Sequence, residues 1–188
     1  VHCGVHWDHS WVEGTKFGEI EDLILYDFAI HWFDFVATVM GSEQPKSVFA
    51  SVARSPSQRI DPPLLAQVLI EYPRAQVSLV FDAHVPQGGW ETTVVAGSKG
   101  ILRAVGTDNK TQTVHVENDE GSFSPKLTRS WFPGGFHGTM AELLLAIAEK
   151  RQPTHSARNN LRSLELCFAA VASSHSGQPV RPGTIDRL

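Results

Sequence analysis

The chain has 188 residues, of which 41% are hydrophobic and 19% are charged. This composition predicts a folded domain with a sizeable core and excludes a disordered chain, because disorder requires low hydrophobicity together with high net charge. The formal net charge is -4, from 16 basic and 20 acidic side chains. A partner such as nucleic acid or an anionic membrane is therefore not expected, because no basic field is available to hold it.

The location of the protein is also constrained by composition. No apolar run approaches the roughly 20 residues that span a bilayer, and no secretory signal opens the chain. Cys3 and Cys167 are the only cysteines and do not form a disulfide framework, which favours a reduced, cytoplasmic setting. Since the chain begins with Val1 and its only methionines are Met40 and Met140, we expect it to be processed or cut from a longer protein.

The first third of the chain predicts an extended arm and then a helix. Residues 1–11, VHCGVHWDHSW, alternate weakly and are typical of a strand or an extended arm. In residues 23–40 apolar side chains recur at spacings of three and four, which predicts an amphipathic helix. Those side chains are Leu23, Tyr26, Ile30, Phe33 and Ala37. Gly41 stands where a C-terminal cap belongs.

The middle of the chain predicts a sheet. Six short runs rich in Val, Ile and Thr, at 46–54, 64–72, 75–85, 90–98, 100–106 and 111–118, are separated by Pro, Gly, Asn and Asp. These are strand and turn signals, and they predict a meander of about six strands. Val77, Leu79 and Phe81 alternate with mixed residues, as expected for an antiparallel sheet covered on one face.

The last third returns to helix. Residues 139–150 carry Met140, Leu143, Leu144 and Ile147 on one stripe, and a second helix is predicted from Ala157 to about residue 174. Ser156 is a good N-cap for this second helix, and Gly177 closes it. The predicted fold class is α+β, with an open, mainly antiparallel sheet of about six strands and helices on one face. The other face is left for a partner or a second copy of the chain.

The pair Asp27 and His31 is the main candidate for chemistry. The two residues are four apart, so on a regular helix they share a face about 6 Å apart. A carboxylate beside an imidazole fixes the tautomer of the ring and stabilises the proton that the ring takes up, so the ring can act as a general base toward a hydroxyl. The alternative is an ion pair on a helix surface, and the spacing alone leaves both open.

The histidine-rich opening offers a second candidate. His2, His6, Asp8 and His9 could supply nitrogen and oxygen ligands to a divalent metal, but no H-E-x-x-H or C-x-x-C signature supports such a site. We expect no metal here. We expect instead that the arm packs beside the first helix and contributes His9 or Trp11 to a substrate pocket.

The segment WFPGGFHGT, residues 131–139, is the third candidate. Its aromatic side chains, together with His137, could line a pocket for a sugar-like ligand or form a hydrophobic plug at a corner of the sheet, and we favour the plug for the aromatic residues. No G-x-G-x-x-G, Walker or G-x-S-x-G motif occurs. The chain by itself therefore lacks a cradle for a dinucleotide pyrophosphate.

Several segments together resemble the C-terminal domain of Gfo/Idh/MocA oxidoreductases, such as glucose–fructose oxidoreductase and inositol dehydrogenase. The segment LILYDFAIHWFDFVATVMG is similar to the family's D-x-x-x-H-x-x-D segment, and VVAGSKGILRA is similar to its G-x-x-G-x-L strand pair. The closing helices, from GTMAELLLAIAEKRQ to SSHSGQPV, resemble those of the family. The similar segments extend from about Ile24 to Val180 and occur in the same order as in the family. The resemblance therefore implies that residues 1–188 form one substrate-binding and oligomerisation domain.

The resemblance implies a function that the residues alone do not establish. It implies an NAD(P)-dependent oxidoreductase of a polyol, sugar or cyclitol, with NAD or NADP bound mainly by an N-terminal Rossmann domain that this chain lacks. His31 would then accept the hydroxyl proton, Asp27 would hold the imidazole and a neighbouring hydroxyl, and Asp34 would be structural. His9, Trp11 and His137 are the expected substrate contacts. The free sheet face would pack against another subunit in a homo-oligomer.

Two rival functions belong to other classes. A non-catalytic oligomerisation module would keep the sheet but have no cleft beside the helix of Asp27 and His31. A metal-dependent hydrolase or isomerase would instead use the opening histidines.

Overall fold

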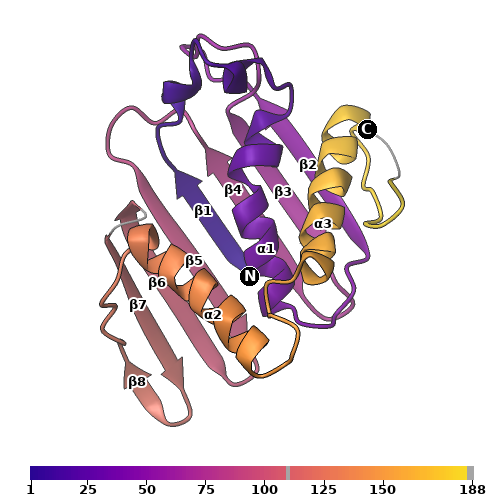
Figure 1. Ribbon diagram of the computed structural model, residues 1–188. Helices are drawn as coiled ribbons and strands as arrows, with labels where there is room; N and C mark the ends of the chain where they lie inside the picture. Colours follow the sequence, from indigo (N-terminus) through magenta and orange to yellow (C-terminus); the bar gives the residue numbers. More distant parts are fainter. Residues whose placement is uncertain (109–110, 186–188) are drawn as a thin grey trace.

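The structure, a computed structural model, describes residues 1–108 and 111–185. Within these residues the chain forms one eight-stranded sheet in the order β2-β3-β4-β1-β5-β6-β7-β8. Figure 1 shows α1, α2 and α3 on one face of this sheet, as an α+β sequence pattern predicts. The strands are β1 (His2–His6), β2 (Ser47–Ala53), β3 (Leu65–Glu71), β4 (Gln76–Asp82), β5 (Trp90–Gly97), β6 (Gly100–Asp108), β7 (Thr111–Asn118) and β8 (Gly121–Phe123).

The six predicted strands are confirmed, and two more join them. β8 is a short addition at one edge, whereas the histidine-rich opening forms β1 in the middle of the sheet. β1 pairs in parallel with β4 and antiparallel with β5, so the predicted meander is interrupted between β4 and β5. Cys3 and Val5 are fully buried on the helix side of β1. β1 is only five residues long, so its alternation is too weak a signal to predict that it lies in the middle of the sheet.

The predicted first helix is divided into a π-helical turn, η3 (Ile24–Phe28), and the α-helix α1 (Ile30–Val39). The amide of Ala29 donates to the carbonyl of Ile24 at 2.9 Å, which is the i to i+5 bond of a π turn. Gly41 follows α1 with a φ of 59°, a left-handed conformation suited to a helix end. The extra residue of the π turn lies just before the first turn of α1, which carries His31.

The core lies between the sheet and the helices α1 and α3 (Ala157–Ser176). Phe33 from α1 and Leu79 and Phe81 from β4 are at most 1% exposed. The predicted boundaries of α3 are confirmed, because the hydroxyl of Ser156 accepts from the amide of Asn159 and Gly177 adopts a left-handed φ of 66°. The same apolar face of β4 that the alternation predicted is therefore the floor of the core.

The helix α2 (Phe136–Ala148) begins three residues earlier than predicted and leaves its apolar stripe uncovered. Met140, Leu144 and Ile147 are 51%, 66% and 65% exposed. Phe136, at the start of the same helix, is also exposed. A continuous stripe of apolar side chains is unusual on a surface that faces water. No helix in the described part of the chain combines the length and apolarity that a membrane crossing needs.

A buried hydroxyl ties α3 to the sheet. Ser173 is fully buried, its Oγ accepts from the amide of Ala50 in β2 at 2.9 Å, and it donates to the carbonyl of Gln178 at 2.7 Å. One side chain therefore satisfies two backbone groups from distant parts of the chain. Burying either group without a partner costs about 1–3 kcal/mol.

We therefore expect Ser173→Ala to lower the free energy of unfolding by about 1–3 kcal/mol, measured by urea denaturation. Ser176→Ala, on the exposed end of the same helix, is the matched control and should change stability by less than about 0.5 kcal/mol. Equal effects of the two variants would contradict the bridging role of Ser173.

Candidate active site

A cavity of about 490 Å³ opens on the helix side of the sheet, beside α1. His31 and Trp32, from the first turn of α1, form one wall, and residues of β5, β6 and β7 form the floor. The segment η4 (Trp131–Gly135) closes another side. We call this the helix-side cavity; it is lined by Trp7, His31, Trp32, Phe35, Glu91, Thr93, Leu102, Ala104, Gln112, Val114, Trp131 and Phe132.

The helix-side cavity combines apolar walls with a few polar groups. The ring of His31 lies edge-on to Trp131, with centroids 5.6 Å apart. Glu91 and Thr93 reach the cavity because they are two residues apart on β5 and so share the helix-side face. Concave, mostly apolar sites with a few convergent polar groups are typical of small-molecule binding.

The structure places Asp27 and His31 in different surroundings. Asp27 belongs to the π turn and accepts a hydrogen bond from His9 Nε2 to its Oδ2 at 3.3 Å. Among the described residues it has no hydrogen bond to His31, and it does not line the helix-side cavity. The expected bond from Asp27 to the His31 imidazole is therefore wrong, because the spacing argument assumed a regular α-helix and the π turn adds a residue.

The extended arm supplies the imidazole that meets Asp27. His9 lies eighteen residues before Asp27 in the chain, and its Nδ1 accepts a hydrogen bond from Trp11 Nε1 at 3.3 Å. The side chain of His9 is 15% exposed and that of Asp27 is 38% exposed. The expectation that the arm packs beside the first helix is confirmed, whereas neither His9 nor Trp11 lines the helix-side cavity.

The aromatic segment after Ser130 lines the cavity instead of plugging a corner. Trp131 and Phe132 are half-exposed and form its outer wall. His137 lies outside the lining, where its Nδ1 accepts from the Arg129 guanidinium at 2.6 Å. The role of His137 as a substrate contact therefore has no support from its position.

Asp34 has the structural setting that we expected for it. The hydroxyl of Ser163 in α3 donates to Asp34 Oδ1 at 2.8 Å. This bond joins α1 to α3. Asp34 therefore contributes to the placement of α1 and lies outside the helix-side cavity.

The four opening residues that could bind a metal each have a separate partner. His2 bonds to the hydroxyl of Ser78, the ring of His6 stacks on Trp90, and Asp8 accepts from the amide of Ser10. His9 bonds to Asp27. Within residues 1–108 and 111–185, no group of three or more His, Cys, Asp or Glu is arranged to hold a metal ion. The geometry thus gives no support to a hydrolase that uses these histidines.

Both cysteines are free and buried. Burial raises the pKa of the Cys167 thiol to about 12, and the carboxylate of Asp22 adds to the shift. Burial also raises the pKa of Cys3, against a weaker opposing hydrogen bond from Thr93. A reactive cysteine needs an accessible thiolate, so neither residue is suited to nucleophilic catalysis.

We expect both thiols to resist Ellman's reagent in the folded chain at neutral pH and to react fully once guanidinium unfolds it. The reason is that burial blocks access and suppresses the thiolate form. The absorbance of the released thionitrobenzoate measures the reaction. Rapid labelling of Cys167 without denaturant would contradict its burial.

Sequence reasoning missed several cavity residues, notably Trp7, Glu91, Thr93 and Gln112. A carboxylate on the covered face of a strand, such as Glu91, is rarely placed there without a role. The alternation within 90–98 was too mixed to show which face of the strand would be covered.

Residues 1–103 match the family model of the GFO/IDH/MocA C-terminal domain, which is more than half of the chain. The chain belongs to the GFO/IDH/MocA family. This confirms the resemblance found in the helix and strand segments. No curated protein matches the chain by sequence.

Solved structures with this fold include proteins from three bacteria. An oxidoreductase from Agrobacterium radiobacter in complex with NAD+, L-tartaric acid and magnesium aligns with a TM-score of 0.75 and 16% identity, over 96% of this chain and 55% of its own. Aldose-aldose oxidoreductase from Caulobacter crescentus complexed with glycerol aligns with a TM-score of 0.70 and 16% identity, over 96% of this chain and 55% of its own. The WlbA dehydrogenase from Bordetella pertussis in complex with NADH and UDP-GlcNAcA aligns with a TM-score of 0.67 and 18% identity, over 98% of this chain and 55% of its own.

At these identities the structural likeness shows the fold alone. The GFO/IDH/MocA chain described here spans about 55% of each of these three proteins.

Proposed function

We propose that this chain is the substrate-binding C-terminal half of an NAD(P)-dependent oxidoreductase that acts on a polyol, sugar or cyclitol. The observation that carries the proposal is the position of His31, which comes from the D-x-x-x-H segment and lines the helix-side cavity. Family membership supports the same reaction class. A non-catalytic oligomerisation module would need no cavity at this helix.

The proposed chemistry divides between His31 and Asp27. As a substrate alcohol is oxidised, its carbon loses a hydride and its hydroxyl loses a proton, so a base must take up that proton. His31 Nε2 or Nδ1 serves as this base at the cavity wall. We assign Asp27, which is 38% exposed and lies outside the lining of this cavity, to a neighbouring hydroxyl that extends beyond the cavity wall. A nicotinamide bound against this surface would supply the hydride acceptor.

The cavity wall suits a hydroxylated ring. Trp32, Trp131 and Phe132 offer aromatic faces to the carbon skeleton of a sugar or cyclitol. The indole N–H of Trp7 is buried without a hydrogen-bond partner among the described residues. A buried donor of this kind costs about 1–3 kcal/mol.

The cofactor needs a second module. The sequence has no glycine-rich phosphate loop, so this chain would contact the nicotinamide end of NAD or NADP, and an N-terminal Rossmann domain would hold the rest. We assign the uncovered stripe of α2 to that domain, because Met140, Leu144 and Ile147 need an apolar partner. α2 follows directly on η4, so a domain docked there would adjoin the cavity.

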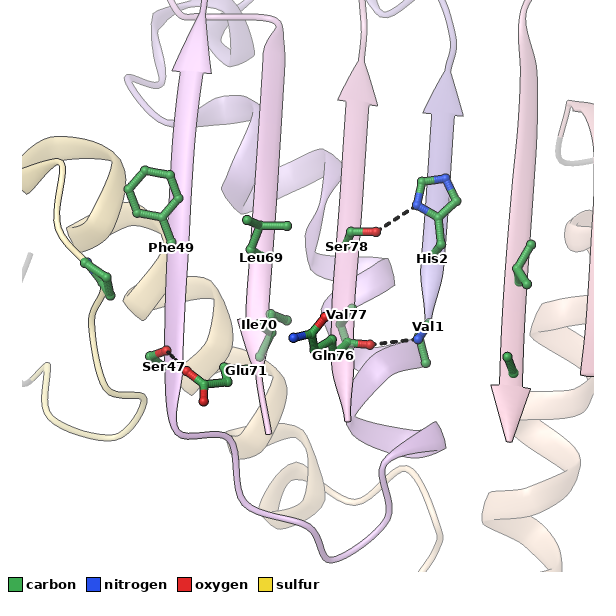
Figure 2. Close-up of a pocket in the computed structure, with 13 residues that line it drawn as sticks. Val1, His2, Ser47, Phe49, Leu69, Ile70, Glu71, Gln76, Val77 and Ser78 are labelled. Atoms are coloured by element: carbon green, nitrogen blue, oxygen red, sulfur yellow. Dashed lines mark hydrogen bonds between the residues drawn. The ribbon is translucent and has the colours of Figure 1, made fainter. Parts of the chain in front are cut away.

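The open face of the sheet, opposite the helices, is the surface that we assign to a second copy of the chain. It is hollowed by a depression of about 550 Å³ that includes Val1, His2, Phe49, Leu69 and Ser78. Figure 2 shows Phe49, Leu69, Ser78 and His2 side by side on neighbouring strands. Phe49, Leu69, Trp90 and Val105 are exposed there.

We also place the enzyme in the cytoplasm, since its cysteines are unpaired.

The function is tested by His31→Ala in the intact protein. Wild type is first assayed with NAD+ and NADP+ against polyols, cyclitols and aldoses, and the variant is then measured on the best substrate. We expect turnover to fall by about 10²–10⁴-fold, the usual contribution of a general base. His155→Ala, an exposed histidine outside the cavity, should retain wild-type turnover. If His31→Ala were as active as wild type, His31 would be removed from the mechanism.

The oligomer is tested by Leu69→Glu, which places a charge on β3 within the open face. We expect sedimentation velocity to show a shift to smaller species, because burying an unpaired carboxylate in an interface is costly. Leu161→Glu is the matched control, since Leu161 is 54% exposed on α3 and Leu69 is 55% exposed. An unchanged assembly for Leu69→Glu would exclude the open face as the interface.

A further inference from the structure

The carboxylate–imidazole pair in this structure joins two separate segments. His9 follows β1, and its backbone amide donates to the carbonyl of Ala83 at 2.8 Å. The preceding residue, Asp8, forms an isolated bridge with His84. The arm is therefore fixed to the chain beyond β4, and it presents the His9 ring to the π turn that carries Asp27.

The hydrogen bonds of His9 define its tautomer. The indole Nε1 of Trp11 can only donate, so the His9 Nδ1 that it contacts at 3.3 Å must be unprotonated. The proton of the neutral ring then lies on Nε2, which donates to Asp27 Oδ2 at 3.3 Å. Edge contacts with Phe28 and Trp11, at centroid distances of 5.0 and 4.9 Å, hold the ring plane.

We propose that His9 is a positioning residue for Asp27, and that Trp11 selects the tautomer that makes this possible. Both nitrogens of the His9 ring are occupied, so the ring acts through Asp27 and does not bind the substrate itself. Its bond to Oδ2 orients the carboxylate, whose Oδ1 has no partner among the described residues. Since Asp27 lies outside the lining of the helix-side cavity, Oδ1 is then the oxygen that receives a substrate hydroxyl extending beyond the cavity wall.

The alternative is that the pair only fastens the arm to the helix. Trp7 already fastens the arm, because its ring makes edge contacts with Phe28 and Trp32 and its backbone amide bonds to Asp82. A merely structural bond at His9 would change stability without a specific effect on Asp27. The catalytic part of the proposal rests on the function proposed for Asp27, whereas the tautomer does not.

The first experiment measures the tautomer in the intact protein, labelled with ¹⁵N at histidine. Two-bond ¹H–¹⁵N correlation spectra distinguish the Nε2–H form from the Nδ1–H form, and the signals of His9 are identified by their loss in His9→Gln. We expect Nε2–H in wild type and a mixture of tautomers in Trp11→Phe, which keeps the aromatic ring but removes the donor. A Nδ1–H ring in wild type would overturn the proposal, whatever the activity.

The second experiment is a double-mutant cycle of turnover on the substrate found for wild type. His9→Leu should lower kcat by roughly 10- to 100-fold, the usual worth of a hydrogen bond to a charged group. His9→Gln, which keeps an N–H donor toward Asp27, should stay within about threefold of wild type. In the Asp27→Ala background His9→Leu should have no further effect.

The outcomes separate this proposal from the function itself. If His9→Leu lowered kcat by the same factor in wild type and in Asp27→Ala, His9 would contribute independently of Asp27. That result would refute a positioning role. A wild-type protein that turns over no polyol, sugar or cyclitol would refute the proposed function and the catalytic role together. The tautomer spectra would then still decide whether Trp11 and Asp27 set the state of the His9 ring.

Discussion

The backbone pairing of β1 is the interaction on which the rest of this structure depends. β1 bonds in parallel to β4 on one side and antiparallel to β5 on the other, so it joins β2–β4 and β5–β8 into one sheet. Without it, the core under α1 and α3 and the cavity over β5–β7 would belong to separate sheets. The residues that follow this strand include Trp7 and His9, which contact η3 and α1.

The π turn at Ile24–Phe28 separates two groups that a regular helix would align. Asp27 faces the arm and bonds to His9, while His31 faces the helix-side cavity. π turns of this kind are frequent at functional sites, because the added residue changes the direction of a side chain. As a result, the Asp27 carboxylate is bonded by His9 from outside the helix, and the His31 imidazole lies among aromatic rings.

The uncovered surfaces agree with a chain that is part of a larger assembly. The apolar stripe of α2 and the open face of the sheet are both exposed. Each contains several apolar side chains, whereas an ordinary protein surface carries them singly. They lie on opposite sides of the sheet (Figure 1). A partner on one of these surfaces, as proposed above, would therefore leave the other surface free.

Local patterns in the sequence were sufficient for the α+β class, six of the strands, the limits of α3 and the candidate residues Asp27 and His31. These depend on short-range periodicity and on caps such as Ser156 and Gly177, which act within a few residues. The place of β1, the π turn and the His9–Asp27 bond were decided only by the tertiary structure. They result from contacts between segments far apart in the chain, such as Cys3 with β4 and His9 with Asp27, and no local spacing encodes such contacts.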